Sequence, residues 1–210
     1  MRRRRDSIFK VGVTGPIGGG KSTVCEEFLR AGIPVIAADD LAKEVLQLGE
    51  IPRAVAKAVG GGVLRADGTV DTAALARTVF SNPSKLAALK KIIHPVVFKI
   101  IDAQFCELAS RGEPAAAIEA ALIYESRFDR QLNFVIAVDA PREERIRRAA
   151  ARLGVPQSEI EMREAGQMPA DEKAARADLL INNRGSLSEL RTQAAFAARL
   201  VRKMAESKGT

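Results

Sequence analysis

The chain has 210 residues and 47% hydrophobic content, enough to bury a sizeable core, and no apolar run approaches the roughly 18 residues of a membrane span. The apolar stretch near Met1 is too short for a secretory signal, so we expect a cytoplasmic protein that binds no membrane. Arg2 to Arg5 supply four positive charges of a net charge of +7, and one Tyr and no Trp offer too little base stacking for an RNA-binding platform.

Strands and helices alternate in the first part of the chain. Residues 8–14 form a nearly continuous apolar run, as expected of a strand that is buried on both faces of a parallel sheet. Residues 21–31 carry apolar side chains at helical spacing, and Gly32 stands where a helix would end. A second buried strand is predicted over 34–38 and a second helix over 39–48. This alternation predicts an α/β fold with right-handed crossovers.

The next segment, residues 49–94, interrupts this alternation. It contains three consecutive glycines, a hairpin-like Ala-Asp-Gly-Thr and helical stretches, but no convincing core strand. We interpret it as an inserted, mostly helical region that binds the substrate. Pro95 suits the first position of a helix over 96–110, with His94 just before it as a possible cap.

Strands return in the second half of the chain, over 115–121 and 134–139, each with an acidic residue at or near its end. Residues 141–177 are rich in Arg, Glu and Ala and predict an exposed helical hairpin of two pieces, broken around Gly154 and again at Met168-Pro169. A last short strand over 178–182 and an amphipathic helix over 186–204 complete the chain.

The residues from Gly15 to Ser22 fit the pattern G-x-x-x-x-G-K-[ST] between a predicted strand and a predicted helix. Glycines let consecutive backbone N–H groups point at a polyphosphate, aided by the positive end of the helix dipole. Lys21 would reach the β- and γ-phosphates of ATP, and the Ser22 hydroxyl would ligate Mg²⁺. A glycine-rich turn that binds nothing is the alternative, against which the flanking strand and helix argue. The expected nucleotide-binding residues are Gly15, Gly18, Gly19, Gly20, Lys21, Ser22 and Thr23.

These elements predict an α/β fold of the P-loop NTPase type, with an open parallel sheet of about five strands flanked by helices. A helical insertion would bind the substrate, and a helical lid would close over it. The expected division of the chain is a nucleotide-binding core (1–48, 111–140 and 178–210), a substrate-binding region (49–110) and a lid (141–177).

Three carboxylates lie near or just after the ends of predicted strands. Asp39 and Asp40 come just after the second strand, at the sheet edge where ligands of open parallel sheets bind. We choose Asp39 as the group that takes the proton from an acceptor hydroxyl, the alternative for both being an N-cap of the next helix. Glu119, near the end of its strand, is a Walker-B-like candidate for Mg²⁺, or a surface carboxylate. No Asp-x-x-Gly or Asn-Lys-x-Asp pattern occurs, which excludes a GTPase.

Four arginines follow helical spacing in the predicted hairpin, so that they share one face of about 120°. Guanidinium groups on a mobile hairpin could neutralise charge on the transferring phosphoryl group, although a solvated charged face would give the same pattern. The four are Arg142, Arg145, Arg148 and Arg152. Cys25 and Cys106 lack metal-ligand spacing and are expected to be reduced thiols without a role in the site.

Four stretches spread over the chain share their residues with one family of P-loop kinases. They are VGVTGPIGGGKSTV at residues 11–24, IHP at 93–95, GQMPADEKAARAD at 166–178 and ADLLINNRG at 177–185. Together they resemble the dephospho-coenzyme A kinase family, nearly end to end. The phosphate loop is common to many families, whereas the other stretches are specific.

The resemblance implies that ATP, with Mg²⁺, phosphorylates the ribose 3′-hydroxyl of dephospho-coenzyme A. It places Asp39 at the catalytic aspartate of the family, the second of an Asp-Ala-Asp, and Arg148 at a lid arginine near ATP. Two positions depart from the family pattern: Ala37 replaces the first aspartate, and Ala121 replaces the proline of a Pro-Leu-Leu-aromatic-Glu stretch. Because Ala37 has no carboxylate, the contribution of the family's first aspartate to positioning the metal or the substrate is in question.

Two further residues are candidate contacts to the acceptor substrate. His94, the only histidine, would touch the substrate or cap a helix. Glu125 matches an acidic position of the family and would face the acceptor.

Two other functions stay open at this point. One is a kinase of another small acceptor such as a nucleoside monophosphate, and the other is a non-catalytic nucleotide-binding module that contacts RNA through Arg2 to Arg5.

Overall fold

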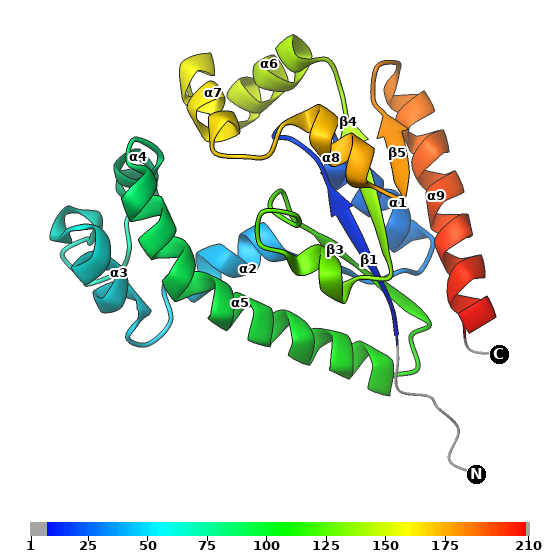
Figure 1. Ribbon diagram of the computed structural model, residues 1–210, viewed down its shortest axis with the longest axis horizontal. Helices are drawn as coiled ribbons and strands as arrows, with labels where there is room; N and C mark the ends of the chain where they lie inside the picture. The colour runs from blue at the N-terminus through cyan, green and yellow to red at the C-terminus, as the bar shows by residue number, and fades with distance from the viewer. Residues whose placement is uncertain (1–7, 209–210) are drawn as a thin grey trace. The chain divides into compact units, whose positions relative to one another are not determined.

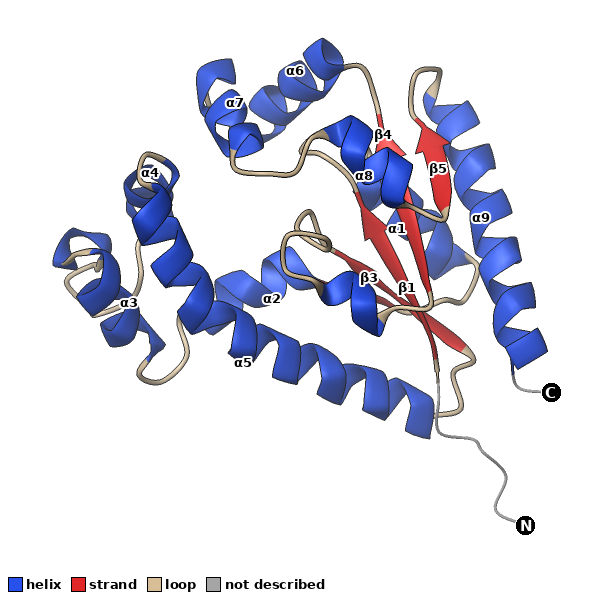
Figure 2. Ribbon diagram, viewed as in Figure 1, coloured by secondary structure: helices blue, strands red, loops and turns tan. Residues whose placement is uncertain are grey.

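Five parallel strands in the order β2-β3-β1-β4-β5 form the sheet of the computed structural model, which describes residues 8–208 (Figure 2). The predicted α/β class of the P-loop type is therefore confirmed. The strands predicted over 34–38 and 115–121 are shorter than expected. The observed strands are β1 (Phe9–Thr14), β2 (Val35–Ala37), β3 (Ala115–Glu119), β4 (Phe134–Asp139) and β5 (Leu179–Asn182).

The chain divides into two compact units (Figure 1). The first unit takes the residues up to Ala37 and from Ala103 onward, and it contains the whole sheet. The second unit runs from Ala38 to Asp102. The finer division into core, substrate-binding region and lid stays a prediction.

The core of the first unit lies between the sheet and two helices, α1 (Lys21–Arg30) and α9 (Leu187–Lys208). Strand β1 pairs with β3 on one side and with β4 on the other, so both of its edges are hydrogen-bonded. Its side chains pack in the core that α1 and α9 share. Val11 and Val13 of this strand are fully buried, together with Val24 and Phe28 of α1. The buried position of β1 explains why its sequence is a continuous apolar run. The glycine-rich loop begins directly after its carboxyl end, Thr14.

The second unit is mostly helical, as the sequence indicates. Its one antiparallel bridge, within the described residues, joins Leu64 to Val70 around the predicted hairpin-like turn. The helices are α2 (Ala38–Val45), α3 (Ile51–Val59), the 3₁₀ turn η1 (Gly61–Val63), α4 (Thr72–Phe80) and α5 (Pro83–Ser110), which runs on into the first unit.

The prediction that a helix begins at Pro95 is wrong, because Pro95 lies inside α5. The helix begins instead at Pro83, where Asn82 accepts a hydrogen bond on Oδ1 from the N–H of Lys85 over 3.1 Å. His94 is therefore not a cap. Ile93, Val97 and Ile101 form one buried stripe that passes Pro95, and this packing outweighs the hydrogen bond that proline cannot make.

Residues 141–177 fold into three helices rather than the predicted two pieces. They are α6 (Arg142–Leu153), α7 (Gln157–Ala165) and, after Met168-Pro169, α8 (Ala170–Arg176). We call α6 and α7 together the arm, residues 142–165. The arm has a small apolar core of its own, against which Ile17 of the glycine-rich loop packs. That core consists of Ile146, Ala149, Ala150 and Ile160.

Two further expectations concern membrane-spanning helices and the basic segment near the start of the chain. No helix within residues 8–208 is both long and apolar enough to cross a membrane. The basic segment Arg2 to Arg5, considered above as a contact for RNA, lies outside the described residues. A second short 3₁₀ turn, η2 (Phe128–Gln131), lies between β3 and β4.

Candidate active site

The glycines of the loop between β1 and α1 allow a neighbouring main chain and a neighbouring side chain to approach it closely. Gly18 has a φ of +74°, and a Cβ there would lie 2.1 Å from the main-chain oxygen of Arg145 in α6. Gly20 has a φ of +104°, and its Cβ would lie 2.6 Å from the side-chain amide of Asn183. Any L side chain would strain the backbone and collide with these groups. The glycines thus allow close packing of the loop against α6 and Asn183.

The amino terminus of α1 presents positive charge to the space above this loop. Gly20 caps the helix without a side-chain hydrogen bond, and no acidic residue occupies the first turn. Lys21 donates hydrogen bonds from Nζ to the carbonyl oxygens of Gly15 at 3.0 Å and Pro16 at 3.2 Å. Since both partners belong to the loop itself, the ammonium group stays beside the loop. Helix dipole and ammonium together favour an anion at this position.

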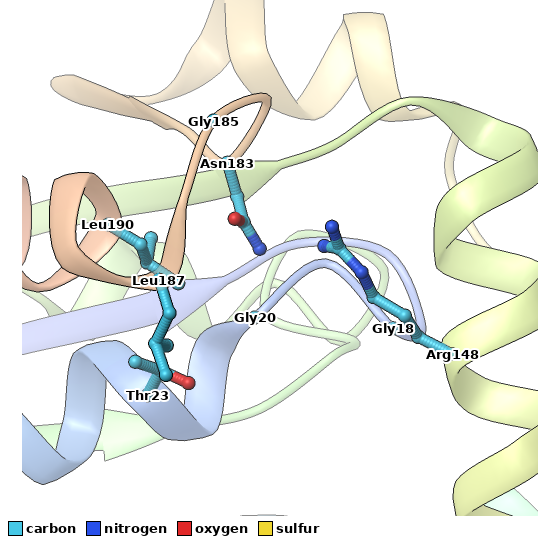
Figure 3. A pocket seen from close by; sticks show the side chains of 8 residues that line it. All are labelled: Gly18, Gly20, Thr23, Arg148, Asn183, Gly185, Leu187 and Leu190. Atoms are coloured by element: carbon cyan, nitrogen blue, oxygen red, sulfur yellow. The ribbon is translucent and has the colours of Figure 1, made fainter.

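A pocket of about 280 Å³ opens beside the loop (Figure 3). Figure 3 shows the guanidinium of Arg148 and the amide of Asn183 extending into the same space, above the loop that carries Gly18 and Gly20. Thr23 of α1 and the start of α9 form another wall. The lining residues are Gly18, Gly20, Thr23, Arg148, Asn183, Gly185, Leu187 and Leu190. The structure therefore brings the predicted Arg148 together with the predicted loop.

Asn183 is a site residue that the sequence analysis missed. It is buried, and its Nδ2 donates a hydrogen bond to the carbonyl oxygen of Gly19 over 3.0 Å. Its backbone N–H donates to the carbonyl of Asp139, the last residue of β4, over 2.7 Å. The available signal was its place in ADLLINNRG, directly after the last predicted strand at the ligand-binding edge of the sheet.

The predicted arginine stripe on α6 is divided between two roles. Arg145 is buried and directed inward: its Nε donates to the carbonyl of Ala140 over 2.9 Å, and its guanidinium pairs with Glu164 of α7. Arg142 also pairs with Glu164, at 2.9 Å. Arg148 is about 40% exposed and pairs with Glu144 at 2.5 Å, one turn earlier on the same helix. An exposed pair of this kind contributes little stability, so Arg148 can exchange its partner for a phosphate at low cost.

Glu119 ends β3, where its register partners are Val13 of β1 and Ala37 of β2. Ala37, at the position where the resembled family has an aspartate, is thus the immediate neighbour of Glu119 in the sheet. Cys25 of α1 lies against the same carboxylate, and burial, followed by the negative charge and hydrogen bond of Glu119, raises the pKa of this thiol. Cys25 is a buried free thiol and Cys106 an exposed one, as expected.

Glu125 lies between β3 and η2, and its carboxylate contacts the distant Met168 and Lys173. Its Oε1 accepts a hydrogen bond from the N–H of Met168 over 2.7 Å and lies 2.9 Å from Nζ of Lys173. The neighbouring Tyr124 packs its ring under the guanidinium of Arg176 at 4.5 Å, and burial raises the pKa of its hydroxyl to about 12. Lys173 was not predicted, since a lysine on a charged helix is usually exposed.

Three predicted residues lie in the second unit. Asp39 and Asp40 occupy the first turn of α2, where negative charge suits the helix dipole, and both are exposed. Asp40 also pairs with Lys43 at 2.7 Å. The ring of His94 packs against that of Phe98 at an interplanar angle of 35°, with 5.4 Å between ring centroids. Burial, followed by the charge of Lys90, lowers the pKa of His94.

Comparisons with known proteins agree with the resemblance. A protein-family model described as Dephospho-CoA kinase matches residues 9–189. A curated Dephospho-CoA kinase from Symbiobacterium thermophilum is 41% identical over 191 residues, 90% of this chain and 80% of the relative. A crystal structure from Thermus thermophilus aligns with a TM-score of 0.76 and 36% identity, covering 92% of this chain and 98% of that one. The Dephospho-CoA kinase from Campylobacter jejuni aligns with a TM-score of 0.61 and 25% identity, over 92% and 97% of the two chains.

Proposed function

This chain belongs to the dephospho-CoA kinase family, and on that premise we propose how its residues transfer a phosphoryl group from ATP to dephospho-coenzyme A. The acceptor is the ribose 3′-hydroxyl, and the products are coenzyme A and ADP. The observation that carries the proposal is the convergence of a positively charged helix end, Lys21 and Arg148 on one loop. A kinase of another small acceptor and a non-catalytic module are not favoured by these relatives.

The loop residues Gly15 to Thr23 hold the triphosphate in this proposal. The first-turn N–H groups of α1 have no capping side chain, so they are suited to phosphate oxygens. Lys21 exchanges the carbonyls of Gly15 and Pro16 for the β- and γ-phosphates. Because the ammonium already lies beside the loop, the exchange requires no large movement of backbone. Thr23 and Arg148 line the adjoining pocket and contact the nucleotide there.

The residues present fit a magnesium ion. Mg²⁺ takes few ligands from a protein and most of the others from water and substrate phosphates, so one or two protein oxygen atoms are enough. Ser22 and Glu119 offer the hard oxygen atoms that Mg²⁺ prefers, and we assign them to hold it. When bound, the ion supplies charge neutralisation on the phosphates.

Asp39 acts as the base that receives the proton of the acceptor hydroxyl. Its side chain is exposed in the first turn of α2, two residues after β2 ends. His94 and Glu125 are proposed to contact the acceptor, His94 through a neutral imidazole, because its lowered pKa disfavours the charged form. Phosphoryl transfer of this kind depends on positioning and electrostatic stabilisation, to which Arg148 contributes by neutralising charge as the arm closes. The arm, α8 and the residues between them thus serve as the lid.

The test is ADP formation measured with and without dephospho-coenzyme A, with the phosphorylated product analysed for its position. We expect ADP to form only when the acceptor is present, and phosphate on the 3′-oxygen alone. ADP formation that is equal without acceptor, or faster with a nucleoside monophosphate, would contradict the proposal. A Lys21→Met variant serves as a control, since it removes the ammonium group from the loop.

A further inference from the structure

Lys173 of α8 is a fully buried lysine that lies outside the phosphate-binding pocket, with an exposed fraction of 0%. Its Nζ donates a hydrogen bond to the carbonyl oxygen of Ala121 over 2.5 Å and lies 2.9 Å from Oε1 of Glu125. The side chain is among the largest that the described residues bury completely. A charged group in such a position is rare without a specific set of partners.

The partners of Lys173 connect α8 to the strand that feeds the phosphate loop. The carbonyl of Ala121 also accepts the hydroxyl of Thr14, at 3.4 Å, and Thr14 is the last residue of β1 before Gly15. The same Oε1 of Glu125 accepts the N–H of Met168 over 2.7 Å. Residues 168–173, which follow the arm, are thus tied to the segment after β3 and through it to the loop entrance.

The other end of the arm is held in a different way. Arg145 in the first turns of α6 donates to the carbonyl of Ala140, directly after β4, and pairs with Glu164 near the end of α7. The arm and the residues that follow it are therefore held at two points, by Arg145 to the segment after β4 and by Met168 and Lys173 to the segment after β3. Arg148 projects into the nucleotide pocket from between them.

Stability alone does not account for the buried pair of Lys173 and Glu125. Removing two charges from water costs about as much as their attraction returns, and apolar side chains of similar volume often fill such a space equally well. In addition, Oε2 of Glu125 is buried without a hydrogen-bond partner among the described residues, a further cost. What an ion pair supplies, and apolar packing does not, is a fixed direction for each group.

We propose that Lys173 is a positioning residue for phosphoryl transfer, which with Glu125 anchors the returning end of the arm so that Arg148 is held over the transferring group. The inference rests on the role proposed above for Arg148. It also accounts for Ala121 in place of the proline of the family pattern. Position 121 contributes its main-chain carbonyl, which alanine and proline supply equally.

The experiment measures kcat per folded active site, counted by nucleotide titration, for Lys173→Met, Lys173→Arg and Lys203→Met. Lys203 is an exposed lysine of α9, so the last variant is a matched control with wild-type kcat. We expect Lys173→Met to lower kcat about 10- to 100-fold, the effect of a displaced catalytic group, and Lys173→Arg to restore most of the loss. A kcat for folded Lys173→Met within about twofold of wild type would overturn the inference.

A double-mutant cycle distinguishes positioning from a loss of stability. If Lys173 acts through Arg148, the variant Lys173→Met/Arg148→Met is hardly slower than Arg148→Met alone, whereas independent effects would multiply and overturn the inference. Should Lys173→Met not fold, Lys173→Met/Glu125→Leu removes both charges and keeps the site apolar. This variant should unfold at the wild-type temperature and still show low kcat at saturating acceptor, where loss of an acceptor contact of Glu125 would instead raise KM. A wild-type kcat under these conditions would overturn the inference. Failure of the proposed function would appear separately, as acceptor-independent ADP formation by the wild type.

Discussion

The side chain of Asn183 donates a hydrogen bond to the main-chain oxygen of Gly19 across 3.0 Å, joining the turn after β5 to the phosphate loop. The backbone N–H of the same residue donates to Asp139 at the end of β4. One asparagine therefore holds the loop against the carboxyl ends of two strands. The loop that we propose to bind the nucleotide is thus held in part by a residue far along the chain.

We expect Asn183→Ala to weaken ATP binding about fivefold, because a hydrogen bond of this kind contributes about 1 kcal/mol. The loop loses a donor, and the carbonyl of Gly19 is left buried beside a cavity. Calorimetric titration with a non-hydrolysable ATP analogue measures the change. Asn133→Ala is a suitable control, since Asn133 accepts the N–H of Lys10 at the opposite, amino end of the strands. Equal affinities of the two variants would show that the Gly19 contact has no influence on the site.

Gly18→Ala should greatly lower activity, because it adds a methyl group at a positive φ and 2.1 Å from the oxygen of Arg145. The strain in φ alone costs about 1 to 2 kcal/mol, and the collision must move either the loop or α6. We expect kcat/KM to fall about 100-fold or more, as for a misplaced catalytic group. Gly62→Ala has open space around the new Cβ and no positive φ, so it should leave kcat/KM unchanged. Steady-state kinetics on the pair would disprove the prediction if both variants behaved alike.

Asp39→Asn should lower kcat about 10²- to 10⁴-fold, the usual contribution of a general base, while the affinity for ATP stays nearly the same. The side chains are almost the same size, so the helix α2 should be preserved. Asp40→Asn changes the neighbouring carboxylate, which pairs with Lys43 and points to a different side of the helix, and should keep nearly all activity. If Asp39→Asn turned over at the wild-type rate, another group would have to receive the proton.

The single histidine predicts how stability depends on pH. Burial lowers the pKa of His94 from its ordinary value of 6.5, so the unfolded chain takes up this proton more readily than the folded one. The contribution of the neutral ring is complete above pH 6.5 and is lost as the pH falls below that value. Urea unfolding of wild type and His94→Gln at about pH 8 and about pH 5.5 measures the effect. The wild type should lose stability relative to the variant at the lower pH, and a constant difference would refute the assignment.

The sequence alone predicts those features that one continuous segment determines. The phosphate loop follows from eight neighbouring positions, and the five strands follow from short apolar runs. Pro95 shows where local rules fail: proline disfavours the interior of a helix, yet Ile93 and Val97 bury one continuous stripe on either side of it. Tertiary packing decided the outcome, and packing is not visible in the local pattern.

The site residues that were missed depend on contacts between distant segments. Asn183 reaches Gly19, and Lys173 reaches Ala121, from positions far along the chain. The arginines of α6 share one spacing, but only the structure separates inward-facing Arg145 from Arg148 in the pocket. Helical periodicity assigns a face to each residue; it does not say which neighbour will cover that face.

Ile17 packs on the apolar core of the arm although it belongs to the loop that we propose to bind phosphate. The arm is therefore incomplete as a separate module. A chimaera that receives residues 142–165 from another kinase would bring a foreign surface against Ile17, and the mismatch would reach the nucleotide through the neighbouring Gly18. A chimaera between relatives should therefore remain active only when residue 17 and residues 142–165 are taken from the same parent. These two distant parts of the sequence have to be exchanged together.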